Sequence, residues 1–146
     1  MSAIDIAVVN ALKNDATLQT LAPGGVFRDV APEAVVNAAL DDADEVFGIV
    51  TLQSAIDRNQ LTTSRAFENC TYLVKFVSPS TSPIGAQAAM DRAEVVLAGL
   101  RGTSAVSGHA VTASFREERI SYVEADGPVY WQHRGASWFI AASATS

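Results

Sequence analysis

Residues 83–101 carry the clearest helical pattern in the chain and constrain the rest of the fold. Ser82 is placed to cap the helix, Pro83 suits its first position, and Gly102 stands where a left-handed residue commonly ends a helix. Small and aliphatic residues recur every three or four positions along one side, at Ala86, Ala89, Met90, Ala93, Val96, Leu97 and Leu100. Because alanines dominate the first half of this stripe, we expect the helix to lie close against a sheet.

Extended segments precede and follow this helix. Phe47–Ala55 is rich in β-branched residues, and in Phe67–Val77 every second residue is apolar and predicted to share one face. Val111–Val123 and Val129–Ala142 form a predicted hairpin. Asp126-Gly127 marks the turn of this hairpin, and Gly135 predicts a β-bulge in its second strand.

The N-terminal third contains weaker signals. Ser2 and Asp5 have the spacing of a capping box at the start of a first helix, and Asp15 is placed to cap a shorter second one. Val26–Val30 is a candidate strand, and Ala34–Leu40 is a candidate helical turn. The element order α-β-β-β-α-β-β predicts an α+β fold, with a mixed or antiparallel sheet and helices packed on one face.

Length and composition are those of one domain spanning residues 1–146. A chain of this length buries enough surface for a core without disulfides, and neither a repeat nor an interdomain linker interrupts it. No apolar run reaches the ~18 residues that a membrane span needs. The first residues lack the basic region of a secretion signal, so we expect none.

The charge distribution argues against a protein that grips nucleic acid. Ten Lys and Arg oppose sixteen Asp and Glu, for a formal net charge of −6. The cations are scattered, whereas binding to phosphates needs them clustered. The densest charge is acidic, and it comprises Asp41, Asp42, Asp44 and Glu45. An acidic surface lining a channel would let DNA slide through without sticking.

Candidate catalytic and metal-binding residues are few. The chain has one cysteine, Cys70, which we expect to be a small buried side chain, and two histidines, His109 and His133. Catalysis by His133 would need an orienting carboxylate such as Glu117 or Glu118. The two histidines lack metal-ligand spacing, and the acidic segment lacks the glycine of a calcium loop. We therefore expect no enzymatic activity, no cofactor and no metal.

The final hairpin concentrates aromatic residues: Phe115, Tyr122, Tyr130, Trp131, Trp138 and Phe139. If helices cover only one side of the sheet, alternate members of this set face outward and indicate a protein partner, because interfaces favour such residues. The alternative is a hairpin covered on both faces.

The polar segment Asp57–Arg65, DRNQLTTSR, joins the two central strands and contains no Asn-Gly or Asp-Gly turn signal. It is either a long hairpin arm that projects from the sheet or an ordinary flexible loop. Both interpretations stay open at this point.

The closing segment RISYVEADGPVYWQHRGASWFIAAS resembles the C-terminal end of tail-terminator (tail-completion, minor tail) proteins of long-tailed bacteriophages. The layout is also similar, with a helical start such as IDIAVVNALKNDATLQTLAPGGVF, a central strand pair, an alanine-rich helix such as AQAAMDRAEVVLAGL and a closing hairpin. The similarity extends from about Ile4 to Ala142 and rests on element order with a few aromatic and glycine positions. It includes no catalytic signature.

The resemblance implies a structural protein of the virion tail and neck, assembled in the host cytoplasm. Such proteins form a hexameric ring on the tail tube, end its polymerisation and meet the head-tail connector, while DNA passes through the ring. Implied partners are further copies of the chain, the tail tube protein and the connector or stopper protein, with no membrane. Alternatives are another neck protein, such as a head-completion or stopper protein, or a small ligand-binding or enzymatic domain.

Ring closure needs heterologous interfaces, in which one patch meets a different patch on the neighbour. We expect the arm, with Arg58 and Arg65, and the acidic segment Asp41–Glu45 to contribute to ring or tube contacts. Trp131 and Trp138 are further candidate interface residues.

Overall fold

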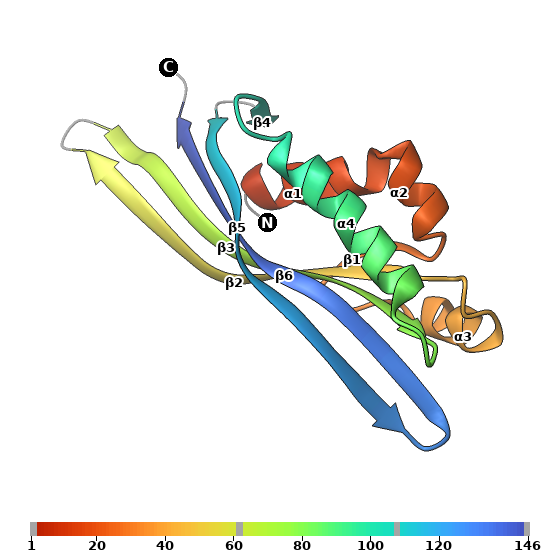
Figure 1. Cartoon of the computed structure of the whole chain (residues 1–146). Coiled ribbons are helices and arrows are strands. Elements are labelled where there is room, and N and C mark those ends of the chain that lie inside the picture. Colours follow the sequence, from red (N-terminus) through yellow and green to blue (C-terminus); the bar gives the residue numbers. More distant parts are fainter. Residues whose placement is uncertain (1–2, 61–62, 107–108, 145–146) are drawn as a thin grey trace.

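A six-stranded mixed sheet lies at the centre of the computed structural model, with strands in the order β1-β2-β3-β6-β5-β4 (Figure 1). The structure describes residues 3–60, 63–106 and 109–144, without the side chains of residues 3, 56–67, 104–106 and 144. In chain order the elements are α1 (Ala3–Asn14), α2 (Ala16–Leu21), β1 (Gly25–Arg28), α3 (Glu33–Asp41), β2 (Phe47–Gln60), β3 (Thr63–Pro79), α4 (Ile84–Ala98), β4 (Ser104–Val106), β5 (His109–Asp126) and β6 (Val129–Ala144). The predicted α+β class with a mixed sheet is confirmed.

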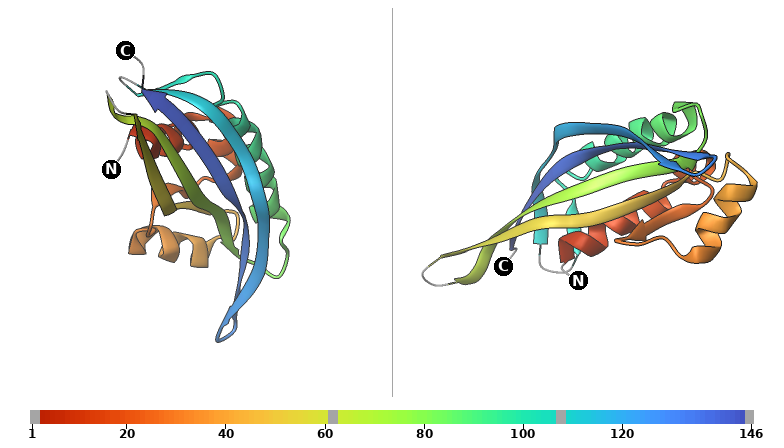
Figure 2. Two further views of the ribbon diagram at one scale, coloured as in Figure 1. Left: turned by 90° about the vertical axis from the view of Figure 1, so that its left-hand side faces the viewer. Right: turned by 90° about the horizontal axis from the view of Figure 1, so that it is seen from below.

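Helices α1, α2 and α4 cover one face of the sheet (Figure 2). Every second residue of β3 and β6 is buried on this face: Cys70, Tyr72, Val74, Phe76, Ala136, Trp138, Ile140 and Ala142. The stripe of α4 packs against them through Ala86, Ala89, Met90, Ala93 and Leu97. Removal of this apolar surface from water is the main force that holds α4 on the sheet. Both the alternation in β3 and the buried side of α4 follow the sequence prediction.

The short helix α3 lies on the opposite face of the sheet. A second core cluster forms there from Ala31, Ala39, Phe47, Val77 and Trp131. Phe47 and Val77 are directly paired across β2 and β3, and side chains alternate along a strand, so both point away from the first core. The expectation of helices on one face therefore holds for α1, α2 and α4 but not for α3.

The ends of α4 differ slightly from those predicted. The helix ends at Ala98 rather than Arg101, although Gly102 is left-handed as expected, with φ 84°. Gly102 lies in the turn toward β4, where its amide donates to the carbonyl of Val111 at 2.9 Å. At the other end, Ser82 Oγ accepts a hydrogen bond from the Ile84 amide at 3.3 Å, close to its predicted capping role.

Gly135 does not form the predicted bulge. It pairs in register with Lys75 of β3 and Ile120 of β5, and the register shifts lie in β5 instead. A Cβ atom at position 135 would stand 2.4 Å from the carbonyl oxygen of Val74 and 2.7 Å from Cβ of Lys75. The bulge prediction was wrong because the glycine instead allows the backbones of β3 and β6 to approach closely.

The β5–β6 hairpin closes through Gly127 and Pro128, since Asp126 pairs directly with Val129. Gly127 has φ 60°, which glycine adopts without a steric penalty, and the fixed negative φ of Pro128 suits the second position of a tight hairpin turn. The turn is one residue later than predicted.

Two long hairpins leave the body of the molecule at opposite ends (Figure 1). The β2 and β3 backbones stay paired out to Gln60 and Thr63, which favours the projecting arm over the flexible loop. The β5–β6 hairpin extends past α4 at the other end. The molecule is therefore elongated along its strands. No helix within the described ranges has the length and apolar character needed to cross a membrane.

Candidate assembly surface

The two tryptophans of β6 lie on opposite faces of the sheet and both are buried. Trp138, 3% exposed, lies in the main core and its Nε1 donates to Ser114 Oγ at 2.8 Å. Trp131, 8% exposed, packs edge-on against Phe47 in the second cluster, with ring centroids 6.3 Å apart. Trp138, a candidate interface residue, thus lies under α4 in the monomer, and its contact with another chain stays a prediction. Trp131 remains at a surface groove.

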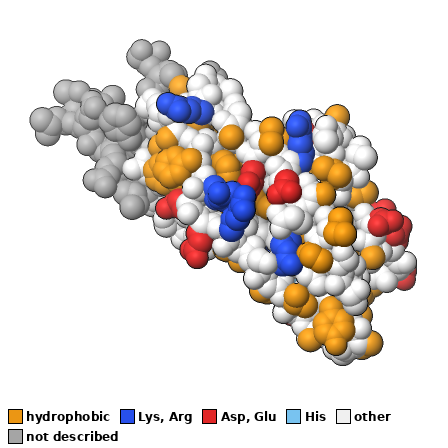
Figure 3. Space-filling model, in the orientation of Figure 1, with side chains coloured by type: hydrophobic (Ala, Val, Ile, Leu, Met, Phe, Trp, Pro, Cys, Tyr) orange, Lys and Arg blue, Asp and Glu red, His pale blue; other side chains and the backbone are white. Residues whose placement is uncertain are grey.

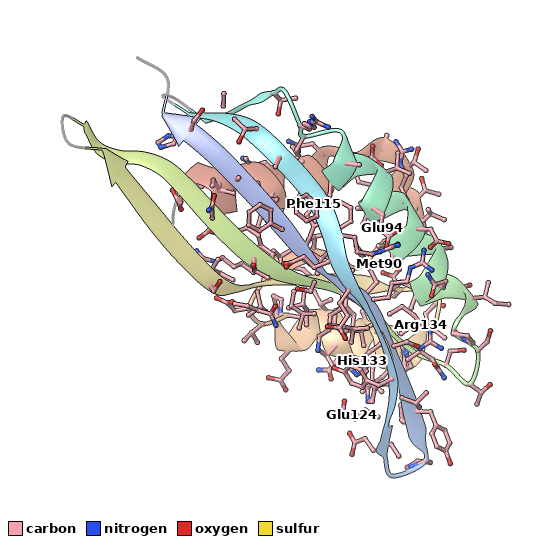
Figure 4. The ribbon with its side chains drawn as sticks, turned by 60° about the vertical axis from the view of Figure 1, so that its left-hand side comes forward. Met90, Glu94, Phe115, Glu124, His133 and Arg134 are labelled. Carbon is pink, nitrogen blue, oxygen red and sulfur yellow. The ribbon has the colours of Figure 1, made fainter. Side chains whose placement is uncertain are left out.

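Aromatic side chains do face outward in the middle of the sheet. They lie on the face opposite α1, α2 and α4, in the part that α3 leaves uncovered. This face is termed here the open face. Phe115 of β5, 50% exposed, packs against Phe139 of β6 with ring centroids 5.0 Å apart. Figure 4 shows Phe115 on the central part of β5. Tyr122, further along the same strand, is also exposed. The expectation that alternate residues of the final hairpin face outward holds for these three residues.

A groove of about 290 Å³ lies on the open face beside α3 and is termed here the α3 groove. Its floor is apolar and its edges are acidic, and it is lined by Asp29, Val30, Ala31, Val36, Phe47, Ile49, Val77, Glu124, Trp131 and His133. Val30 projects from the edge with 74% of its surface exposed. Asp29 beside it is left-handed, with φ 65°, a conformation that non-glycine residues adopt rarely and at a cost.

Four polar residues on β3, β5 and β6 form a connected cluster at the groove, the His133 cluster. The ring of Tyr122 stacks on His133, 4.3 Å between centroids, and Lys75 Nζ donates to the Tyr122 hydroxyl at 3.0 Å. Glu124 Oε1 lies 3.4 Å from His133 Nε2, and Figure 4 shows both residues toward the tip of the hairpin. Burial lowers the pKa of His133, and Lys75 lowers it further, whereas Glu124 acts in the opposite direction.

His133 carries an unsatisfied polar atom at this position. The residue is 7% exposed, and its buried Nδ1 has no hydrogen-bond partner among the described residues. Buried polar atoms are nearly always paired, because desolvation without a partner costs free energy. A residue that lines the groove therefore holds a buried hydrogen-bonding atom without a described partner.

Both long edges of the sheet are open over part of their length. β1 pairs with β2 only at Phe47–Val50, and β4 pairs with β5 only at its start, near His109 and Ala110. Beyond these positions the outer edges of β2 and β5 have no strand partner within the described ranges. Register shifts at Val111/Ala113 and Arg116/Glu118 interrupt β5. Free edges offer unpaired backbone groups to a strand of another chain, and bulges and charges limit indiscriminate pairing.

The predicted acidic segment lies at the groove end of the molecule, at the end of α3 and in the turn that follows. Asp41, Asp42 and Asp44 are exposed and Glu45 is half-buried. The Asp42 side chain accepts a hydrogen bond from the Asp44 amide at 2.9 Å, so part of this charge stabilises the turn itself. Figure 3 shows acidic side chains gathered at this end. Their contact with another chain stays a prediction.

The side chains of Arg58 and Arg65 lie outside the described residues, so their role in contacts also stays a prediction. The groups considered for catalysis do not converge. Cys70 is fully buried, and burial together with Glu68 raises the pKa of its thiol to about 12. His109 lies far along the chain from the His133 cluster, at the start of β5. Within the described residues, no group of three His, Cys, Asp or Glu is arranged to hold a metal ion.

Sequence reasoning missed a buried polar contact that joins α1 to the sheet. Asp5 is 2% exposed, and its carboxylate accepts a hydrogen bond from the Tyr72 hydroxyl and pairs with Arg28 at 2.9 Å. The predicted capping box stays a prediction, because Ser2 lies outside the described residues; within them, Asp5 belongs to the core. The signal available in the sequence was an acidic residue within an otherwise apolar helical stripe.

Comparison with known proteins identifies the fold but not a family. No protein-family model matches the chain, and no curated protein matches it. Among solved structures, the chain is similar to one from the virion of a native gene transfer agent particle. The two chains are 15% identical, with a TM-score of 0.65, and the match covers 94% of this chain and 92% of the other. The chain thus shares its fold, over almost all of its length, with a chain of that virion.

Proposed function

We propose that this chain is a structural protein of a virion, which closes into a ring at the end of the tail tube, ends tube polymerisation and joins the tail to the head-tail connector. The observation that carries the proposal is the likeness, over 94% of the chain, to a chain of the gene transfer agent virion. The resemblance of the closing hairpin to tail-terminator proteins supports the finer assignment and a hexameric ring.

The geometry of the monomer supports assembly through heterologous contacts. Hairpins project at opposite ends, and the two open sheet edges belong to different strands, β2 and β5. A contact between such unlike surfaces leaves each copy free to bind a further copy, which generates a ring when the rotation closes. Edge-to-edge pairing of strands supplies main-chain hydrogen bonds for such a contact.

The charge of the chain suits a ring that surrounds DNA without holding it. The net charge of −6 repels a polyanion, and the cations are spread along the sequence. We assign no catalytic step to the chain, because its titratable groups do not converge with a nucleophile in the described part of the structure. On this proposal its partners are further copies of itself, the tube protein and a connector protein, and its location is the tail and neck of the virion.

The test is native mass measurement of the purified chain, alone and with polymerised tail tube protein, combined with electron microscopy of the tube ends. We expect a ring seated on one end of each tube, and tubes that stop growing once it is bound. Since ring proteins can stay monomeric until they meet their template, the sample with tubes decides the outcome. A chain that stays monomeric and leaves growing tubes unaffected would overturn the proposal. A ring that binds only the connector would favour a stopper protein instead.

A further inference from the structure

The α3 groove combines an apolar floor with an acidic edge, and this combination selects the chemistry of its occupant. Phe47, Ile49 and Trp131 provide apolar floor surface, and Glu124 at the edge is 63% exposed. An aliphatic side chain flanked by cations is complementary to such a surface, because the aliphatic group removes apolar area from water and the cations meet the carboxylates.

Two observations indicate that the groove is built to be occupied. His133, which lines the groove, has a buried Nδ1 without a described hydrogen-bond partner. Asp29 at its edge holds a left-handed backbone conformation, which places the exposed Val30 side chain beside the groove. Strained backbone of this kind clusters at sites where a ligand is clamped.

The sequence of the chain itself contains a segment with the complementary chemistry. Between Asp57 and Arg65, at the tip of the β2–β3 hairpin, the only large aliphatic residue is Leu61. Two arginines, Arg58 and Arg65, flank it, against a single aspartate. Hydroxyl and amide residues fill the remaining positions and can offer a hydrogen bond to the histidine.

We propose that the α3 groove receives the tip of the β2–β3 hairpin of a second copy of this chain. The hairpin and the groove lie at opposite ends of the molecule (Figure 1), so one copy does not make the contact with itself. The contact is heterologous and leaves a free hairpin and a free groove on the resulting pair. This inference rests on the proposed function, since it names the surfaces through which copies join.

Site-directed crosslinking tests the contact. Two singly substituted chains with different tags, Leu61→Cys and Val30→Cys, are mixed and treated with a short bismaleimide. Val30 is exposed, so its substitution removes no core packing. We expect a product carrying both tags. The matched control replaces Val30→Cys by Val95→Cys, which is similarly exposed but lies on α4, on the other side of the sheet. The wild-type chain reports any reaction of the buried Cys70.

Charge reversal provides a second readout. Arg58→Glu with Arg65→Glu in the Leu61→Cys chain should reduce the crosslinked product to the level of the Val95→Cys control. Glu124→Arg in the Val30→Cys chain should restore part of it, because the opposite charges then face each other again. Failure of reversal to alter the yield would overturn the charge-complementary contact.

The outcomes separate this inference from the proposed function. Rings could form without the crosslink between Leu61→Cys and Val30→Cys, or with an equal yield of the crosslink between Leu61→Cys and Val95→Cys. Either result would overturn the groove contact and leave the ring proposal intact. A specific product from chains that never form rings, with or without tubes, would support the contact and overturn the ring.

Discussion

Arg92 of α4 donates two hydrogen bonds to Asp15, from Nε and Nη2, each at 2.9 Å. Asp15 is also the N-cap of α2 and accepts from the Leu18 amide at 2.9 Å. One carboxylate therefore caps a helix and ties it to the helix that covers the sheet. The cap follows from the local sequence, whereas the tie depends on a residue 77 positions away.

Replacement of Asp15 should separate these two roles. Asp15→Ala removes the acceptor and should lower the free energy of unfolding by about 1 kcal/mol from the cap alone. Asp15→Asn keeps an acceptor for the Leu18 amide and should cost less. Urea denaturation of the three proteins measures the difference, and equal losses in both variants would show that the cap contributes little.

The Asp15–Arg92 pair also makes the free energy of unfolding depend on pH. The hydrogen bond from Arg92 lowers the pKa of Asp15, so the folded chain releases this proton more readily than the unfolded chain. Its contribution is present above the ordinary pKa of an aspartate and is lost as pH falls through the lowered value. Denaturation at a series of pH values should show a shallower decline in Arg92→Ala than in the wild type. An unchanged slope would contradict the coupling.

His133 should make the chain less stable in mild acid. Burial holds its pKa below 6.5, so the unfolded chain takes up a proton first as pH falls. The contribution to stability is full above pH 6.5 and declines below it, until the folded-state value is reached. NMR titration of the imidazole gives the folded value directly, and His133→Gln should flatten this part of the stability profile. An imidazole that titrates above 6.5 would reverse the prediction.

Cys70 should be inert while the chain is folded. Its thiol is fully buried, and its pKa is raised to about 12, so little thiolate exists at neutral pH. An aromatic disulfide reagent should label no thiol in native protein and one per chain in denaturant. Rapid labelling of the native chain would show that the β3 strand opens far more often than its burial indicates.

Gly135→Ala should be among the most destabilising single-methyl changes in the sheet. The new Cβ would meet the Val74 carbonyl oxygen at 2.4 Å, and relief requires β3 and β6 to separate locally, at a cost of about 3 kcal/mol. Gly127→Ala is the matched control, because a Cβ there meets nothing within 4 Å and costs only the strain of φ 60°, about 1 kcal/mol. Thermal denaturation should rank the two variants in this order.

The sequence predicted the elements that local signals define. The alanine-rich side of α4, the strand alternation around Cys70 and the final hairpin all depend on spacing within a short window, and all three are confirmed. Structural features that depend on contacts between distant residues could not be predicted from such local spacing. The seven-residue spacing between Trp131 and Trp138 places them on opposite faces of a regular strand, but only the position of α3 shows that both faces are covered there.

The candidate site was predictable in composition rather than in place. The acidic segment and the aromatic hairpin stood out in the sequence, yet the α3 groove draws on residues from five separate elements and one loop. Asp29 and Val30, at its edge, were predicted as the end of the candidate strand Val26–Val30, but β1 ends at Arg28. Gly135 illustrates the same limit, since a bulge and a close backbone approach demand the same residue for different reasons.

The placement of the hairpin and the groove at opposite ends of the molecule affects how a ring of copies would be completed. Any open arc of copies joined in this manner exposes one unfilled groove and one unbound hairpin, whatever its length. Only the copy that closes the ring forms two contacts in one step. A partial arc therefore has fewer contacts per copy than a closed ring. Assembly of this kind would pass from single chains to whole circles with few intermediates.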